Sequence, residues 1–299
     1  MSFNDNAQLD TSQVTSGGGR GRSVAVGGGV GGTLVAIVLA LLFGGNILGD
    51  GSSAFDPADV IQSGQGASGP DLTQCKTGAD ANREADCRIV GTVNSVQDYW
   101  ADAMPASLNR QYTQAKTVIY SGSTQSACGT ASNAVGPFYC PTDKRVYIDA
   151  SFFDELTTRF GADSGALAQE YVVAHEYGHH VQDILGVLGR AQSSATGAQS
   201  GSVRIELMAD CFAGVWAQHA ATTQDAGGNS LVKPLSNADV ASALSAASAV
   251  GDDRIQKASS GRVNPESWTH GSSKQRQTWF LTGYRSGDPN RCDTLSGTI

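Results

Sequence analysis

Residues 174–182 read AHEYGHHVQ, which places three histidines and a glutamate within six positions of a chain that has only five His. Residues four apart share a helix face, so the rings of His175 and His179 can point at one ion. Glu176 lies about 100° around the helix axis, beside that ion rather than on it. Two imidazoles on a metal with a carboxylate next to a water is the arrangement of a hydrolytic zinc site. The segment predicts one Zn²⁺ ion, with Glu176 as general base.

A third ligand is expected from VRIELMADCFAGVW (203–216), where Glu206 and Asp210 are four residues apart on a second predicted helix. That helix is otherwise largely apolar, so two carboxylates on one face are costly unless a cation compensates them. We assign Glu206 as the third metal ligand and Asp210 as the acceptor that orients the His175 ring. Two alternatives stay open: Asp210 on the metal instead, or a structural salt bridge between Glu206 and Arg204.

The remaining histidines receive different roles. His270, in WTHGSS, is the first candidate for the group that stabilises the oxyanion, and Tyr177 is the second. A loop histidine that only makes local hydrogen bonds is the alternative for His270. We expect His180 to make a hydrogen bond in the packing layer and His219 to be a residue of a helix C-terminus.

Together these residues predict a peptidase that hydrolyses peptide bonds of a peptide or protein substrate with a zinc-activated water. Two other classes of function stay open. One is a non-catalytic binding or scaffold protein that contains zinc, in which substitution of Glu176 would change nothing measurable. The other is a zinc amide or ester hydrolase that acts on cell-envelope material.

An apolar segment precedes these motifs: Val24–Leu48 is 25 residues without a charge, preceded by two arginines and followed by aspartates. About 20 apolar residues cross a bilayer, and positive charge marks the cytoplasmic side. We therefore predict a disordered cytoplasmic head (1–22), a transmembrane helix (23–48), a flexible linker (49–70) and an extracytoplasmic domain (71–299). This describes a single-pass cell membrane protein, and a cleaved signal peptide is the alternative.

Charge and cysteine content agree with export and exclude one class of partner. The net charge is −8 and no block is rich in Lys or Arg, so no nucleic-acid partner is expected. All six cysteines follow the apolar segment, as disulfides of an exported domain would. Disulfides between cysteines close in sequence are the most plausible, so we expect Cys75 to pair with Cys87 and Cys128 with Cys140. The two remaining cysteines, Cys211 and Cys292, then form the third pair. A free, buried Cys211 is the alternative for the last pair.

The rest of the domain reads as α+β, with a small antiparallel sheet followed by a helical body. TVIYS (117–121) and KRVYID (144–149) are rich in β-branched and aromatic residues and predict strands, the second of them as the edge of the substrate cleft. Apolar spacing predicts the following helices: 89–104, closed by Pro105, and 152–160, 167–185, 203–221, 237–257 and 274–284. Ser236 and Ser273 are the expected N-caps.

Six segments of the sequence carry a resemblance to a known family: GSTQSACG, GPFYCPTDKRVYID, AHEYGHHVQ, ELMADCFAGVWAQHA, GDDRIQ and THGSSKQRQTWF. Together they closely resemble the bacterial putative neutral zinc metallopeptidases, membrane-anchored proteins of the zincin type. The resemblance covers about residues 70–295. It implies a zincin-like fold, a peptidase activity, and a third ligand donated by the E-x-x-x-D helix, which carries onto Glu206 and Asp210.

Overall fold

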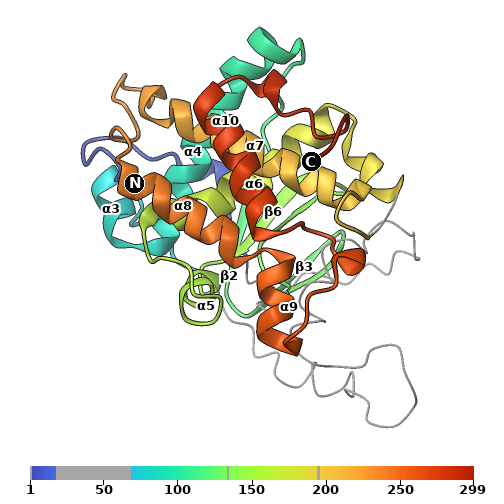
Figure 1. The fold of residues 1–299 in the computed structure, drawn as a ribbon. Coiled ribbons are helices and arrows are strands. Elements are labelled where there is room, and N and C mark those ends of the chain that lie inside the picture. Colours follow the sequence, from blue (N-terminus) through green and yellow to red (C-terminus); the bar gives the residue numbers. More distant parts are fainter. Residues whose placement is uncertain (1, 18–68, 133–134, 194–195) are drawn as a thin grey trace.

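The computed structural model describes residues 2–17, 69–132, 135–193 and 196–299, which form an α+β domain (Figure 1). Its helices are α3 (Gly78–Arg83), α4 (Ala85–Ala103), α5 (Phe152–Thr158), α6 (Ala166–Ile184), α7 (Gly201–His219), α8 (Asn237–Ala249), α9 (Asp252–Ser260) and α10 (Ser273–Ser286). Its strands are β1 (Val14–Gly17), β2 (Lys116–Tyr120), β3 (Ser123–Ser126), β4 (Gly129–Ser132), β5 (Phe138–Cys140) and β6 (Arg145–Asp149).

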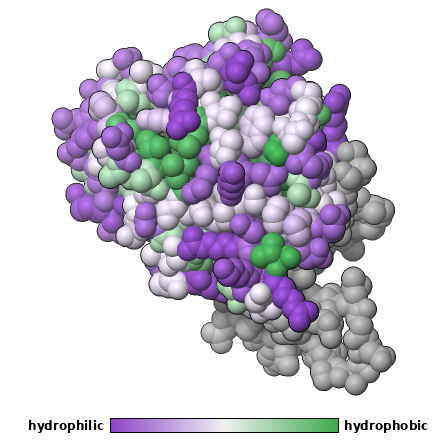
Figure 2. All heavy atoms as spheres, viewed as in Figure 1, coloured by the Kyte–Doolittle hydropathy of each residue, from purple (hydrophilic) through white to green (hydrophobic). Residues whose placement is uncertain are grey.

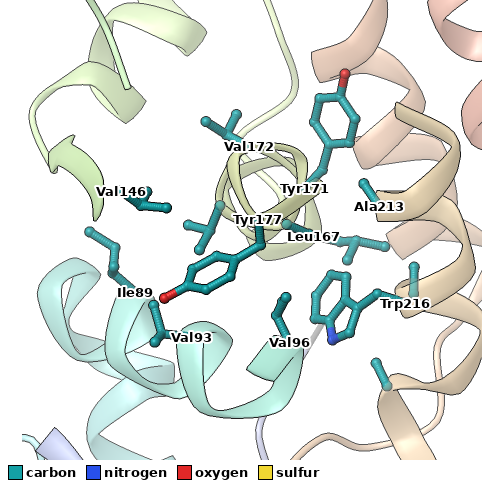
Figure 3. Packing of buried hydrophobic residues seen from close by; sticks show 14 of the residues in the cluster. Ile89, Val93, Val96, Val146, Leu167, Tyr171, Val172, Tyr177, Ala213 and Trp216 are labelled. Carbon is teal, nitrogen blue, oxygen red and sulfur yellow. The ribbon is translucent and has the colours of Figure 1, made fainter. Parts of the chain in front are cut away.

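Helix α6 lies in the middle of the helical body, with α4, α7 and α8 packed on it and α10 packed on α7. Figure 3 shows the core that these helices share, where Val96 of α4, Leu167 of α6 and Trp216 of α7 meet. Trp216 is fully buried, and its indole N–H donates to Ser95 Oγ at 3.1 Å. The helix that carries the histidines is therefore held on several sides.

The main sheet is mixed, in the order β1-β2-β6-β5, so the predicted antiparallel sheet is wrong. Strands β1, β2 and β6 run parallel, and only β5 is antiparallel to its neighbour β6. Residues 121–144 between β2 and β6 contain the β3–β4 hairpin and β5, which gives the chain the length that a parallel crossover requires. β6 is an inner strand, so the prediction that KRVYID forms the edge of the cleft is also wrong.

The predicted helices are present with changed ends. The predicted helix 237–257 is two helices, α8 and α9, because Gly251 between them adopts an extended conformation. A side chain at this position would not fit, since a Cβ atom would lie 2.4 Å from the Ser273 backbone nitrogen. The α4 helix does not end at Pro105 but continues as a π-helical turn (Met104–Leu108). Ser236 is an N-cap as predicted, whereas α10 is capped by Ser272 rather than by Ser273.

The predicted disordered head is wrong for residues 2–17, which are ordered and pack on the rest of the domain. Phe3 is 0% exposed and Val14 is 6% exposed, and β1 pairs with β2. These apolar side chains and strand hydrogen bonds compensate the entropy lost on ordering a polar segment. The predicted transmembrane helix (23–48) and most of the predicted linker lie outside the described residues. Among the residues that are described, no helix is both long and apolar enough to span a bilayer.

Three disulfides confirm the predicted pairings. Cys75–Cys87 and Cys128–Cys140 each join residues 12 apart, and Cys211–Cys292 joins residues 81 apart. The last bond ties the C-terminal tail to α7, the helix that carries Glu206. On the face drawn in Figure 2, hydrophilic residues predominate and hydrophobic ones form a few patches among them.

Candidate metal centre

Helices α6 and α7 bring the three predicted ligands together. The rings of His175 and His179 lie one turn apart with centroids separated by 4.8 Å. Glu206 faces both of them from α7: one carboxylate oxygen lies 3.1 Å from His175 Nε2 and the other lies 3.5 Å from His179 Nε2. One donor atom of each residue lies within 4.8 Å of the other two. This set of two imidazole nitrogens and one carboxylate could hold a zinc ion with a position left open for a water.

Gly178 allows α6 and α7 to approach closely at this point. A Cβ atom on Gly178 would lie 2.9 Å from the Cα atom of Ala209, closer than such atoms pack. Ala209 is itself small and fully buried. The two small residues thus set the separation across which Glu206 reaches the histidine rings.

Asp210 does not join the three ligands but holds the His175 ring from behind. Its Oδ1 atom lies 2.8 Å from His175 Nδ1 and also accepts from the Tyr171 hydroxyl at 2.5 Å. Arg276 of α10 donates from Nε to Oδ2 and from Nη2 to Oδ1, both at 2.9 Å. With Asp210 accepting, His175 Nδ1 carries a proton, and His175 Nε2 faces Glu206.

His179 is oriented by a different partner, Gln182, whose Oε1 atom lies 2.8 Å from His179 Nδ1. The Gln182 amide donates in turn to the Ile205 carbonyl of α7 at 2.6 Å. Both rings therefore present their Nε2 atoms to the space between the helices. Each is fixed through its Nδ1 atom by a buried polar group.

Glu176 is 93% buried beside the ligands. Burial raises the pKa of Glu176 to about 7, although a hydrogen bond from the Tyr139 backbone opposes the shift. A carboxyl with such a pKa can both accept and return a proton near neutral pH. The predicted general base thus has the environment that its role requires.

The three predicted ligands influence one another's pKa values. Burial alone would lower the pKa of His175, but Asp210 and Glu206 beside it raise the value to about 9. Burial lowers the pKa of His179 to about 4. Burial would raise the pKa of Glu206, but the neighbouring His179 and His270 lower it well below the usual range. A carboxylate held ionised among histidines is a favourable environment for a cation.

The ligands and Glu176 open onto one cleft. His270 and Arg276 also line this cleft. The rest of its wall is formed by the segment before β5 and by apolar side chains of other elements: Val135, Gly136 and Pro137, and Phe152, Phe160, Val172, Val250 and Ile255. Asp252, the first residue of α9, fixes the position of His270. One Asp252 carboxylate oxygen accepts from the backbone N–H groups of His270 and Gly271, at 2.7 and 3.0 Å, and its other oxygen lies 3.6 Å from His270 Nδ1.

Of the other predicted residues, Tyr177 is not at the site. Figure 3 shows it pointing away from Tyr171, toward Ile89 and Val93 of α4. Its hydroxyl lies 2.9 Å from Thr117 Oγ1, so the prediction that Tyr177 is a second candidate for stabilising the oxyanion is wrong. Residues two apart on a helix lie about 200° apart, so Tyr177 is on the face of α6 opposite to His175 and His179.

The two remaining histidines lie where the sequence predicted. His180 bonds the Tyr139 hydroxyl at 3.0 Å and the Thr113 carbonyl at 2.6 Å, within the packing layer. His219 ends α7, and its Nε2 atom lies 3.0 Å from the Gly287 carbonyl.

Sequence reasoning missed the residues that support the ligands: Arg276, Tyr171, Gln182 and Asp252. One signal was available for Arg276. Two buried carboxylates on one apolar helix require two compensating positive groups. If a metal compensates Glu206, Asp210 still needs a positively charged partner of its own. Its partner comes from α10, 66 residues later, and no local spacing identifies so distant a residue.

Comparison with known proteins decides the family. The family model described as "Putative neutral zinc metallopeptidase" matches residues 3–295. The chain belongs to this family. The matched residues include nearly all of the N-terminal segment (residues 2–17) and the two helices, α6 and α7, that carry the predicted metal ligands.

Two bacterial relatives of this family member show how far the similarity extends. The protein Rv2575 of Mycobacterium tuberculosis is 56% identical over 231 residues, which covers 77% of each chain. YpfJ of Escherichia coli K12 is 42% identical over 248 residues, 77% of this chain and 83% of its own. Both are described as uncharacterized proteins. No solved structure matches the metallopeptidase-family chain.

Proposed function

We propose that this protein is a zincin-like, zinc-dependent peptidase that holds one zinc ion with His175, His179 and Glu206. The observation that carries the proposal is the convergence of these three donors within 4.8 Å of one another in an open cleft. Glu176 lies beside them on the same helix. The family description supports zinc and a peptide or protein substrate.

The chain's own residues supply the proton transfers of hydrolysis. A zinc ion, when bound, provides Lewis acidity that lowers the pKa of water and polarises the substrate carbonyl. Glu176 accepts a proton from the attacking water as the water oxygen bonds to the carbonyl carbon. Glu176 then delivers that proton to the leaving nitrogen as the peptide C–N bond breaks.

His270 is the group that we assign to the developing oxyanion. Its side chain lines the cleft. Burial would lower the pKa of His270, but Glu206 and Asp252 raise it, and Asp252 remains beside the ring when Glu206 binds a metal. A ring that keeps its proton can donate to an oxyanion. Asp252 is the positioning residue that holds the loop of His270 in place.

The substrate is expected along β5 rather than along β6. Among the described strands, β5 is one of the two edge strands of the main sheet, and the Tyr139 backbone in it already bonds Glu176. Residues 135–137, immediately before it, line the cleft. An extended peptide added to this edge would pass beside the general base.

The test is zinc content together with cleavage of a broad peptide library by the wild type, Glu176→Gln and the surface control Glu266→Gln. We expect equal zinc in all three, cleavage by the wild type and by Glu266→Gln, and a loss of at least about 10²-fold in Glu176→Gln. Zinc in all three with cleavage in none would favour the binding or scaffold function. Cleavage of amide or ester model compounds but of no peptide would favour the other hydrolase class.

A further inference from the structure

The N-terminal segment, residues 2–17, is bound to the domain through a site shaped for it. Phe3 is 0% exposed and lies over Gly91 of α4, where a Cβ atom would come within 2.6 Å of the Phe3 ring. The Asn82 side chain accepts from the Phe3 backbone N–H at 2.8 Å and donates to the Phe3 carbonyl at 3.0 Å. An asparagine that satisfies both backbone groups of one residue recognises main chain at a fixed position.

The same recognition continues along the segment. Asn94 of α4 accepts from the Asp10 N–H and donates to the Asp10 carbonyl, both at 2.9 Å. The buried Gln97 amide donates to the Gln13 side chain at 2.8 Å. Strand β1 then pairs with β2 over four residues, which covers an edge of the sheet that would otherwise be open. Three amides of α3 and α4 thus make these hydrogen bonds only when the N-terminal segment is in place.

The two ends of the chain between the N-terminal segment and the domain lie side by side. A Cβ atom on Gly69 would overlap the Ser16 side chain and lie 2.5 Å from the Gly17 carbonyl oxygen. Residues 17 and 69 are therefore in contact, although 51 residues (18–68) separate them in the sequence. The two described parts on either side of residues 18–68 therefore meet at one point.

We infer that residues 2–17 lie in the same compartment as residues 69–299, on one side of any membrane that the apolar run contacts. A single bilayer crossing between residues 17 and 69 would put the two contacting parts on opposite sides. Two crossings need roughly 40 apolar residues, whereas Val24–Leu48 supplies 25. The three disulfides assign the domain to an oxidising compartment. The inference replaces a cytoplasmic N-terminus with an exported one, and it does not depend on the zinc chemistry.

The test is an engineered disulfide between Gln8→Cys and Thr77→Cys in the full chain. Residues 8 and 77 form an isolated antiparallel bridge flanked by hydrogen bonds from Leu9 to Lys76 and from Gly78 to Ala7. They are therefore a non-hydrogen-bonded pair, whose Cα atoms lie about 4.5 Å apart, within disulfide range. Cells are treated with N-ethylmaleimide before lysis, and the protein is digested with trypsin without reduction. Residues 1–20 and 77–83 are tryptic peptides that contain no native cysteine.

We expect mass spectrometry to find these two peptides linked in most of the protein. In the control pair Gln8→Cys/Lys257→Cys, Lys257 is an exposed residue of α9, a helix that lies away from the N-terminus in Figure 1. Both of its cysteines should carry maleimide. A link that forms only after the membrane is dissolved and an oxidant is added would overturn the inference. So would the absence of the link under every condition, since a docked pair at this distance must oxidise.

The Thr77→Cys substitution removes a hydroxyl that bonds Asp80 at the start of α3, so a second, independent measurement leaves Thr77 in place. Asn6 is exposed and its side chain can be replaced without loss of a buried contact. Asn6→Cys and Lys257→Cys should react equally with a membrane-impermeant maleimide on intact protoplasts. Reaction of Asn6→Cys only after permeabilisation, while Lys257→Cys reacts at once, would place the N-terminus across the membrane and contradict the inference.

Discussion

At the scale of single residues, the site is defined by how its buried charges are balanced. The sequence indicated that the carboxylates of Glu206 and Asp210, on an apolar helix, need a compensating positive charge. The expected metal ion was assigned that role for both carboxylates. In the structure the two carboxylates have different partners, because Glu206 faces the two histidines whereas Asp210 pairs with Arg276 at 2.9 Å. The motif residues were predictable because helical spacing fixes them. Their partners were not, because those partners come from other helices.

Asp210→Asn tests the orientation of the His175 ring. The amide can still contact Nδ1 but no longer provides the charge that fixes the ring proton there, so we expect zinc affinity to fall about 10–100-fold. Affinity is measured by competition with a chelator, with the exposed Asp102→Asn as the matched control. Unchanged zinc affinity of Asp210→Asn would show that the His175 ring keeps its orientation without the Asp210 carboxylate.

Glu170 predicts a pH dependence of stability that is separate from the metal site. Its carboxylate is fully buried, and neither oxygen has a hydrogen-bond partner among the described residues. Burial raises its pKa from 4.5 to about 7. Between these two values the folded protein binds more protons than the unfolded chain, so the free energy of unfolding falls as pH rises across the window.

Glu170→Gln removes this titration. We expect its free energy of unfolding, relative to the wild type, to rise by about 2–3 kcal/mol between pH 4.5 and pH 7 and then to stay constant. Denaturant unfolding at several pH values measures it, and Glu266→Gln should follow the wild type. Parallel pH profiles of Glu170→Gln and the wild type would contradict the assignment.

At the scale of elements, the metal centre depends on one close helix contact. Periodicity predicted α6 and α7 nearly to their ends, because both are long and buried on most faces. It did not predict that β2 and β6 run parallel, since strand order depends on pairings between distant residues. It also misplaced Tyr177, although helical spacing puts that residue two positions from both His175 and His179 and therefore on the opposite face of α6.

Gly178→Ala tests the helix contact. The added methyl would lie 2.9 Å from the Ala209 backbone, so the helices must separate, at a cost of about 1–3 kcal/mol in unfolding free energy. Zinc affinity should fall as well, because Glu206 moves away from the rings. The control is Gly189→Ala, where a Cβ atom would have no neighbour within 4 Å. Equal stability and affinity of both variants would show that this contact does not set the geometry.

At the scale of the whole molecule, the N-terminal segment is part of the folded domain. Composition suggested disorder for it, because 2–17 is short and polar and its few apolar residues show no periodicity. Its order comes from partners more than 60 residues away, such as Asn82 and Asn94. The disulfides were easier to predict, since two of them close short local loops and the third follows by elimination.

Phe3→Ala measures what the segment contributes to the domain. Loss of a fully buried phenylalanine side chain should lower the free energy of unfolding by about 3–5 kcal/mol, whereas the exposed Asn6→Ala should change it by less than about 0.5 kcal/mol. Denaturant unfolding of the full chain gives both values. A Phe3→Ala protein as stable as the wild type would mean that residues 2–17 are not docked.

The most direct test of the central claim is a zinc titration of the metal-free protein with a competing chelator, for the wild type, Glu206→Gln and Glu266→Gln. We expect one zinc ion per chain in the wild type and in Glu266→Gln. In Glu206→Gln we expect a loss of affinity larger than the roughly 10–100-fold of a residue that only orients a ligand. If the folded wild type binds no zinc, or if Glu206→Gln binds zinc as tightly as the wild type, then His175, His179 and Glu206 do not form a zinc site.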